Sequence, residues 1–409
     1  MRRSSIDSIH RARLVFLLLL FVVSPCIHAG GAFTQTGDMA AKRALHGAAL
    51  LPDGRVLVVG GISDFGVFVP TAELYDPATG TFSNTGSPNE SRMRPTTVVL
   101  ADGRVLVAGG LADDGATYLQ SAEIYDPATG AFTATGDMTV RRYVASAALL
   151  EDGRVLLAAG FNRDDGPLTS AEIYDPATGE FTATGSLALP RSEPKAVVRL
   201  LDGRVLIAGG SNEDGPIGTA EIYDPATGTF ANTAGDLVHK LEDHSLALLD
   251  DGRVLVVGGS DGGQTGLPIY YADAELFDPA TGMFTSTGSL EFPREFTTAS
   301  HLPDGRILVA GGLHTGGGPG FGVVAEVEVY DPATGGFTRA DDMPVPLDEP
   351  AAVVLDDQRV LLVGGFDFDN DLPTASAEVF TPNIADAIFA NGFDPLVLDP
   401  AFGVRGARK

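Results

Sequence analysis

The sequence contains no tryptophan and only one cysteine, Cys26. An intramolecular disulfide needs two cysteines, so the chain must fold without one. Basic residues are also scarce, with 27 against 54 acidic residues and a formal net charge of −27. Such a surface repels nucleic acid and anionic membranes. We attribute the charge to solubility, and attraction of cations or basic partners is the alternative.

Long apolar runs are also missing. The run Leu14–Val23 has ten residues, which is too short to span a bilayer. It follows a segment with four arginines, and Ala29 before Gly30 fits a cleavage point. We therefore predict that residues 1–29 are a signal peptide and that the mature protein is secreted or periplasmic, with no transmembrane segment. Two alternatives stay open: an uncleaved anchor, and a lipoprotein attached through Cys26.

What the chain does contain is a repeat. An Asp-Gly turn followed by a β-branched run and a glycine pair recurs with steps of 49 to 53 residues. The turns begin at Asp53, Asp102, Asp152, Asp202, Asp251, Asp304 and, in degraded form, Asp357. A second repeated segment, such as 122–132 (AEIYDPATGAF), lies between successive turns. A period near 50 predicts an array of identical supersecondary units.

Each unit reads as four short strands, which we call a, b, c and d. Asp-Gly joins strand a to strand b, and Pro-Ala-Thr-Gly joins strand c to strand d, both in tight turns. Strand b, such as Val56–Val59, has no polar face, so it must be covered on both sides. Radial packing of such sheets gives a β-propeller.

The ends of the repeat indicate a closed ring. Six units are complete, and the seventh lacks its strand d. The missing piece stands at the other end, where 32–38 (AFTQTGD) matches 131–137 (AFTATGD). We therefore predict an all-β fold: a seven-bladed β-propeller of four-stranded antiparallel blades over residues 30–382, its last blade closed by the N-terminal strand. Residues 383–409 are expected to form a C-terminal tail.

The unit resembles the kelch repeat. The resemblance rests on the diglycine after strand b, on Glu-x-Tyr-Asp-Pro in strand c, on an aromatic residue in strand d and on a downstream arginine. Phenylalanine, as at Phe132, replaces the tryptophan usual in strand d. The resemblance implies a kelch-type propeller of the galactose oxidase superfamily fold, without the oxidase chemistry. The copper-radical oxidases of that family need a Tyr–Cys crosslink, which a mature chain without cysteine cannot make.

Residues that occur in every unit are expected to serve the blade. They are the strand c glutamates and the arginines after Asp-Gly, for which we predict an ion pair with each other. The b–c loops, in contrast, all differ, and variable loops on a rigid scaffold are where binding usually occurs. The d–a loops lie at the same end and carry the kelch-type arginines, which are expected either to brace the loops or to form a cationic ring that holds a carboxylate. The candidate residues of this b–c/d–a face are Arg43, His46, Arg92, Tyr118, Arg142, Phe161, His244, Tyr270, Tyr271, Arg294, Phe366 and Phe368.

No residue pattern predicts a catalytic, cofactor or metal site. Asp367, Asp369 and Asp371 resemble the start of a calcium loop, but Leu372 stands where such a loop needs glycine. We therefore expect no cofactor, with Ca²⁺ at these aspartates as the alternative. His46 and His244 occupy equivalent positions and are expected to be structural or to lie at the channel mouth.

The sequence thus predicts an exported, monomeric and non-catalytic propeller that binds a protein or a glycan through its b–c/d–a face. Two alternatives stay open: a carbohydrate-active enzyme, such as a sugar-acid epimerase or lyase, and a structural component of a bacterial cell envelope.

Overall fold

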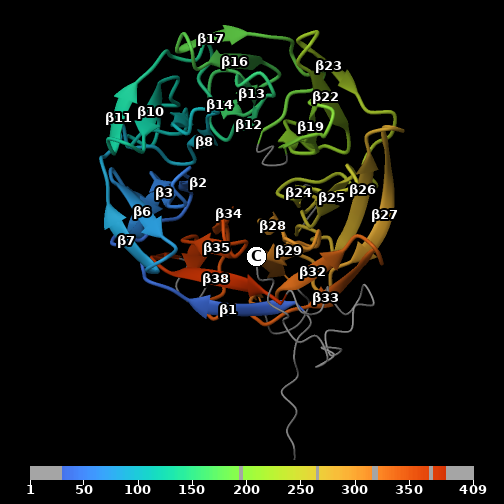
Figure 1. Ribbon diagram of the computed structural model, residues 1–409. Coiled ribbons are helices and arrows are strands. Elements are labelled where there is room, and N and C mark those ends of the chain that lie inside the picture. The colour runs from blue at the N-terminus through green and yellow to red at the C-terminus, as the bar shows by residue number, and fades with distance from the viewer. Residues whose placement is uncertain (1–29, 193–196, 264–266, 316–320, 368–371, 384–409) are drawn as a thin grey trace, which may run out of the picture.

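Seven four-stranded antiparallel sheets surround a central axis in a computed structural model of the chain (Figure 1). The structure describes residues 30–192, 197–263, 267–315, 321–367 and 372–383. The predicted signal peptide and all but the first residue of the predicted tail lie outside these ranges. The described part contains one short 3₁₀ helix, η1 (Asp64–Gly66). The prediction of an all-β, seven-bladed propeller is therefore confirmed.

Every blade runs from an inner strand at the axis to an outer strand at the rim, in the order a, b, c, d. Blade 1 consists of β2 (Gly47–Leu50), β3 (Val56–Val59), β6 (Ala72–Asp76) and β7 (Thr81–Asn84). Blade 2 consists of β8 (Thr96–Val99), β9 (Val105–Ala108), β10 (Ala122–Asp126) and β11 (Ala131–Ala134). Blade 3 consists of β12 (Ser146–Leu149), β13 (Val155–Ala158), β16 (Ala171–Asp175) and β17 (Glu180–Ala183). Blade 4 consists of β18 (Val197–Arg199), β19 (Val205–Ala208), β22 (Ala220–Asp224) and β23 (Thr229–Asn232). Blade 5 consists of β24 (Ser245–Leu248), β25 (Val254–Val257), β26 (Asp273–Asp278) and β27 (Met283–Ser289). Blade 6 consists of β28 (Thr298–His301), β29 (Ile307–Ala310), β32 (Glu328–Asp331) and β33 (Gly336–Arg339).

Blade 7 joins the two ends of the described chain. It combines β34 (Ala351–Val354), β35 (Val360–Val363) and β38 (Ala377–Pro382) with β1 (Gly31–Gln35) as its outer strand. The register pairs Gly31 with Pro382 and Gln35 with Glu378. In Figure 1 the blue β1 lies against the red β38 at the rim. The predicted closure by the N-terminal strand is confirmed, and it covers the edge that β38 would otherwise expose.

Strand b explains why the blades pack into a ring. All four residues of β3 are buried, and their side chains alternate between two neighbouring cores. Val56 and Val58 pack in the core between blades 7 and 1, whereas Leu57 and Val59 pack in the core between blades 1 and 2. Period-two alternation with no polar position therefore gives each blade an apolar surface on both sides.

The glycine pairs allow neighbouring backbones to approach closely. Gly60 and Gly61 have φ of 71° and 85°. A Cβ atom on Gly60 would lie 2.5 Å from the Arg92 carbonyl oxygen, and one on Gly61 would lie 2.5 Å from that of Ala44. Only glycine satisfies both the left-handed backbone and the missing space.

A hydroxyl pair joins most neighbouring blades at the rim. In the pair Thr135–Tyr174, the threonine follows strand d of one blade and the tyrosine lies in strand c of the next, with 2.9 Å between the two hydroxyl oxygens. Equivalent pairs are Thr36–Tyr75, Thr85–Tyr125, Thr184–Tyr223 and Thr287–Tyr330. Blades 5 and 7 carry Phe277 and Phe380 in place of the tyrosine. These contacts are the polar counterpart of the apolar cores between the blades.

The two ends of the ring carry different connections. We call the end with the a–b and c–d turns the turn face, and the end with the b–c and d–a loops the loop face. Five of the b–c loops fold into small hairpins that the sequence did not predict. They are β4 (Ile62–Ser63) with β5 (Val67–Phe68), β14 (Phe161–Asn162) with β15 (Gly166–Pro167), β20 (Ser211–Asn212) with β21 (Gly215–Pro216), β30 (Leu313–Thr315) with β31 (Phe321–Val323), and β36 (Phe366–Asp367) with β37 (Leu372–Pro373).

Backbone pairs tie the loops of the loop face to one another. The d–a segment entering blade 1 pairs with the b–c loop of blade 7 through Arg43 and Thr374, and with its own b–c loop through Ala44 and Ile62. Similar pairs recur around the ring, such as Tyr143 with Phe161. The variable loops are therefore held on the scaffold in a fixed arrangement.

Candidate functional site

The arginines after Asp-Gly lie on the turn face and are neutralised within their own turns. The Arg55 guanidinium lies 2.6 Å from the Asp53 carboxylate. The same i, i+2 ion pair recurs in the other six blades: Arg104–Asp102, Arg154–Asp152, Arg204–Asp202, Arg253–Asp251, Arg306–Asp304 and Arg359–Asp357. The predicted pairing of these arginines with the strand c glutamates is wrong, because the glutamates lie toward the other end of the blade.

The strand c glutamates pair instead with the kelch-type arginines of the d–a loops. Arg142 donates to the carbonyl oxygens of Ala159 (2.8 Å) and Ser170 (3.0 Å) and to Glu172 Oε1 (2.7 Å). Burial lowers the pKa of Arg142, and the hydrogen bond and charge of Glu172 act against that shift. The same ion pair forms in four other blades: Arg43–Glu73, Arg92–Glu123, Arg191–Glu221 and Arg294–Glu328.

This network corrects one prediction about ligand binding. Arg43, Arg92, Arg142 and Arg294 are at most 1% exposed, so the structure does not bring them together as a cationic ring at the channel mouth. Their donors satisfy backbone carbonyl groups beside strands b and c and the buried glutamate, which is a bracing role. The sequence places Arg191 one residue out of step, yet it occupies the same place in blade 4.

Two blades lack the arginine. Leu241 and Leu347 are buried in its place in blades 5 and 7. Burial raises the pKa of Glu275. In blade 7, burial raises the pKa of Glu378 from its ordinary 4.5 to about 7, opposed by the hydrogen bond from the Val345 backbone. Glu378 is therefore the most perturbed carboxyl group of the repeat.

The two candidate histidines are packed between blades. The ring of His244 lies against Gly209 of blade 4, and the ring of His46 lies against Gly364 of blade 7. Burial lowers the pKa of His244 to about 4. Burial, and then the charge of Arg43, lowers the pKa of His46 to about 3. Both imidazoles are neutral at physiological pH, and both residues line the mouth of the axial cavity.

The candidate aromatic residues form separate groups on the loop face. Tyr118 meets Phe161, and Tyr143, which the sequence did not single out, joins them. Tyr271 stacks on His239 with 4.1 Å between the ring centroids. Of the remaining candidates, Tyr270 pairs through its backbone with Ser260, Phe366 pairs with Asp348, and Phe368 lies outside the described residues.

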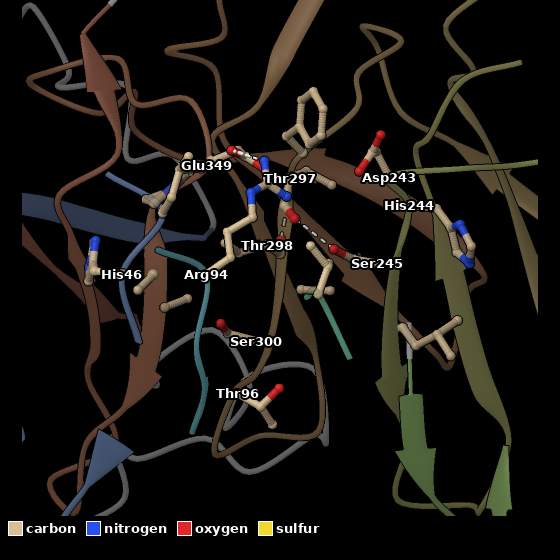
Figure 2. A pocket seen from close by; sticks show the side chains of 18 of the residues that line it. His46, Arg94, Thr96, Asp243, His244, Ser245, Thr297, Thr298, Ser300 and Glu349 are labelled. Carbon is tan, nitrogen blue, oxygen red and sulfur yellow. Dashed lines mark hydrogen bonds and ion pairs between the residues drawn. The ribbon is translucent and has the colours of Figure 1, made fainter. Parts of the chain in front are cut away.

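A cavity of about 420 Å³ opens at the axis on the loop face (Figure 2). Arg94 of blade 2 reaches across it to Glu349 of blade 7, with 2.9 and 2.8 Å between Nη2 and the two carboxylate oxygens. In six of the seven blades, one described residue just before strand a holds a left-handed backbone with φ between 49° and 57° and lines this cavity: Leu45, Arg94, Val144, Asp243, Phe296 and Glu349. Such outliers are costly for residues other than glycine, and they cluster at functional sites.

Sequence inspection singled out His46 and His244 but missed these six left-handed residues of the cavity. The six described residues all differ from one another, so they do not appear as a motif. Their one shared signal is position: they follow two residues after the kelch arginine, or after the leucine that replaces it. A search for the least repeated position in an otherwise repeated segment would have found them.

The loop face also gathers the exposed apolar side chains. Phe65, at the tip of the hairpin of blade 1, is 92% exposed. Of the nine exposed large apolar residues that the structure describes, six lie on this face: Phe65, Val67, Leu189, Val238, Leu267 and Ile269. Three of the described cations have neither an ion pair nor a side-chain hydrogen bond to another described residue, and all three are on the same face: Arg141, Arg163 and Lys240. The loop face is therefore chemically varied, whereas the turn face is repetitive.

No group of three or more His, Cys, Asp or Glu side chains within the described ranges is arranged to hold a metal ion. Asp369 and Asp371 of the calcium hypothesis lie outside those ranges, and so the hypothesis stays a prediction. No helix in the described part is long and apolar enough to cross a membrane.

Comparison with known proteins agrees with the geometry. The family model described as "Kelch motif" matches residues 92–139, which run from the buried Arg92 through one blade. The chain is a seven-bladed β-propeller that contains a kelch motif. A stretch of 93 residues, 23% of the chain, is 36% identical to the spermatocyte protein spe-26 of Caenorhabditis elegans. That stretch spans only 15% of the relative's length.

The kelch propeller also resembles a solved enzyme structure. A fungal alcohol oxidase of the AA5 family, in complex with copper, superimposes with a TM-score of 0.67 at 20% identity. The match covers 87% of this chain and 76% of the oxidase. At this identity the likeness shows the fold alone. The kelch fold supports a binding or scaffold role, and its chemistry has to be argued from the residues of this chain.

Proposed function

We propose that this kelch propeller is a non-catalytic, exported scaffold that binds a partner protein through its loop face. One observation carries the proposal: the exposed apolar side chains and the unpaired cations gather on the loop face, while every arginine of the Asp-Gly turns is neutralised by its own aspartate. Kelch propellers generally mediate protein interactions. Variable, rigidly held loops with exposed apolar groups are what a protein interface requires.

A pull-down from the envelope fraction of the source organism tests the proposal. The first variant replaces Phe65, Leu267 and Ile269 with serine, and the matched control replaces Leu201, which is exposed on the turn face, with serine. We expect the loop-face variant to lose the partner that the wild type and the control retain. Loss of the partner from the control alone would overturn the proposal.

Export is part of the same proposal. The basic segment, the short apolar run and Ala29 support it. N-terminal sequencing of the protein recovered from its organism should begin at Gly30. Recovery of an intact N-terminus would contradict cleavage, and a lipid on Cys26 would establish the lipoprotein alternative.

The axial cavity favours a second candidate function, the binding or conversion of a carbohydrate. Its walls bring together a guanidinium, two carboxyl groups and hydroxyl side chains from Arg94, Asp243, Glu349, Ser245 and Thr298 (Figure 2). A few converging polar groups in a concave site are the usual signature of a small-molecule site. A glycan array with the wild type and Asp243→Asn tests this candidate. Binding that is equal in both proteins, or absent from the wild type, would rule the cavity out as the glycan site.

A further inference from the structure

Three aromatic rings from three segments meet on the loop face at the junction of blades 2 and 3. Tyr118 lies in the b–c loop of blade 2, Tyr143 in the d–a segment entering blade 3, and Phe161 in β14. The Tyr118 ring meets the other two edge-on, with centroids 6.0 Å away at 81° and 5.7 Å away at 61°. Each residue is only partly buried. The rings therefore form an apolar surface that is open to a partner.

The backbone fixes this cluster in place. Tyr143 and Phe161 exchange two backbone hydrogen bonds of 2.9 Å, and Tyr118 pairs with Leu111. A partner that binds here would not have to order the loops first. Such preorganisation lowers the entropic cost of binding.

Two exposed arginines lie in the segments that carry Tyr143 and Phe161. Arg141 precedes Tyr143 by two residues and Arg163 follows Phe161 by two, and the antiparallel pairing of Tyr143 with Phe161 brings the two segments that carry these arginines together. The Asn162 side chain confirms the proximity, because its amide donates to the Arg141 carbonyl oxygen at 3.1 Å.

Neither guanidinium has an ion pair or a hydrogen bond within the described ranges. Asp164 and Asp165 follow in the hairpin turn, but Asp165 accepts from Asn162 at 3.0 Å, and neither aspartate pairs with an arginine. Two adjacent unpaired guanidinium groups are unusual in a chain with twice as many acidic as basic residues. The third unpaired cation, Lys240, lies between blades 4 and 5 and has no such neighbour.

Tyrosine and arginine are the residue types that dominate binding energy at protein interfaces. Guanidinium groups select carboxylates through paired hydrogen bonds. The rings meet edge to face and so do not form the flat platform on which a sugar would stack, which favours a protein over a glycan.

We propose that Tyr118, Tyr143, Phe161, Arg141 and Arg163 form a docking patch for a protein segment that presents carboxylates beside an aromatic or aliphatic side chain. The inference rests on the proposed function and deepens it. The acidic surface around the patch repels such a segment elsewhere, so binding is confined to this junction.

Fluorescence anisotropy with a labelled random copolymer of glutamate and tyrosine tests the patch on the full chain. The copolymer of lysine and tyrosine serves as the charge control. The variants are Arg141→Glu and Arg163→Glu, and Lys240→Glu is a matched control because it makes the same charge change on the same face. We expect the wild type to bind the glutamate copolymer, and each arginine variant to weaken binding about tenfold. Lys240→Glu should change the dissociation constant less than twofold.

A further variant separates the rings from the charge. Tyr118→Ser keeps both arginines and should also weaken binding of the glutamate copolymer.

The patch is refuted if the wild type does not bind that copolymer, if Lys240→Glu weakens binding as much as the arginine variants, or if the lysine copolymer binds better. Binding of polygalacturonate in place of the copolymer would assign the patch to an acidic glycan. Self-association in sedimentation that Arg141→Glu abolishes would assign it to a second copy of this chain. The proposed function survives any of these results if the loop-face variant still loses its partner in the pull-down.

Discussion

Replacing Glu378 with glutamine should stabilise the protein above neutral pH. Glu378 is fully buried in β38, the strand that closes the ring against β1. Its Oε1 accepts from the Val345 amide at 2.6 Å, and its Oε2 has no hydrogen bond within the described ranges. By contrast, Glu123 of blade 2 accepts from Arg92 and from Asn89 and Glu90.

The magnitude follows from the pKa of the buried carboxyl group. A rise from 4.5 to about 7 corresponds to about 3 kcal/mol between the two protonation states. The folded chain holds the proton more tightly than the unfolded chain, so the favourable contribution is complete below pH 4.5. It is lost as the pH rises to 7. Above pH 7 the folded protein carries a buried carboxylate without a cation, and its free energy of unfolding is about 3 kcal/mol lower.

Glutamine keeps the acceptor for the Val345 amide and removes the charge. For a folded unit of about 350 residues, 3 kcal/mol corresponds to a shift in Tm of about 4 °C. Calorimetry between pH 4 and pH 8.5 should therefore show Glu378→Gln near the wild type at pH 4 and about 4 °C above it at pH 8. Glu123→Gln is the matched control, which should lower Tm at both pH values because it removes the buried carboxylate partner of Arg92 and leaves only the exposed Glu90. A Glu378→Gln protein that melts below the wild type at pH 8 would refute the reasoning.

Three further predictions concern the contacts that hold the ring. Arg142→Ala leaves Glu172 buried without a cation and should cost about 3–5 kcal/mol in urea denaturation, whereas an unchanged stability with lost ligand binding would restore the ligand role of this arginine. Tyr174→Phe removes the hydroxyl pair with Thr135 and should cost about 1 kcal/mol, and a neutral effect would show that apolar packing alone sets the junction of blades 2 and 3. Deletion of residues 31–35 exposes the edge of β38 and should produce oligomers in size-exclusion chromatography, and a stable monomer would contradict the closing role of β1.

The ring itself was predictable from sequence because every local signal occurs several times. Turn residues, strand b and the glycine pair agree in nearly all blades, so a weak signal in one copy is supported by the others. The last unit lacks its strand d, and residues 32–38 match a strand d but belong to no other unit. Only one arrangement then pairs all the strands. The register of β1 with β38 is the one that this match requires.

The ion-pair partners were not predictable from repetition alone. Each repeat offers two arginines for one glutamate, and both arginines recur with the same period. The register of β3 with β6 resolves the choice, because it places Glu73 opposite Val58, near the loop face. Arg55 stands at the opposite end of the same strand and meets Asp53 instead. Sequence spacing fixes position along the chain, whereas strand pairing decides which end of the blade a side chain reaches.

The departures from the repeat occur together. Blades 5 and 7 carry leucine in place of the kelch arginine, at Leu241 and Leu347, and phenylalanine in place of the strand c tyrosine, at Phe277 and Phe380. Thus each loses both a polar brace at the loop face and the hydroxyl pair to the preceding blade. The junctions of blades 4 with 5 and 6 with 7 retain their apolar cores, and those cores contain Phe277 and Phe380. Directional contacts hold an arrangement more specifically than apolar contacts do, so these two junctions carry the fewest geometric constraints in the described part of the ring. Blades 5, 6 and 7 also supply three of the six described left-handed residues of the axial cavity. The aromatic and arginine patch, by contrast, lies at the junction of blades 2 and 3, which keeps both kinds of directional contact.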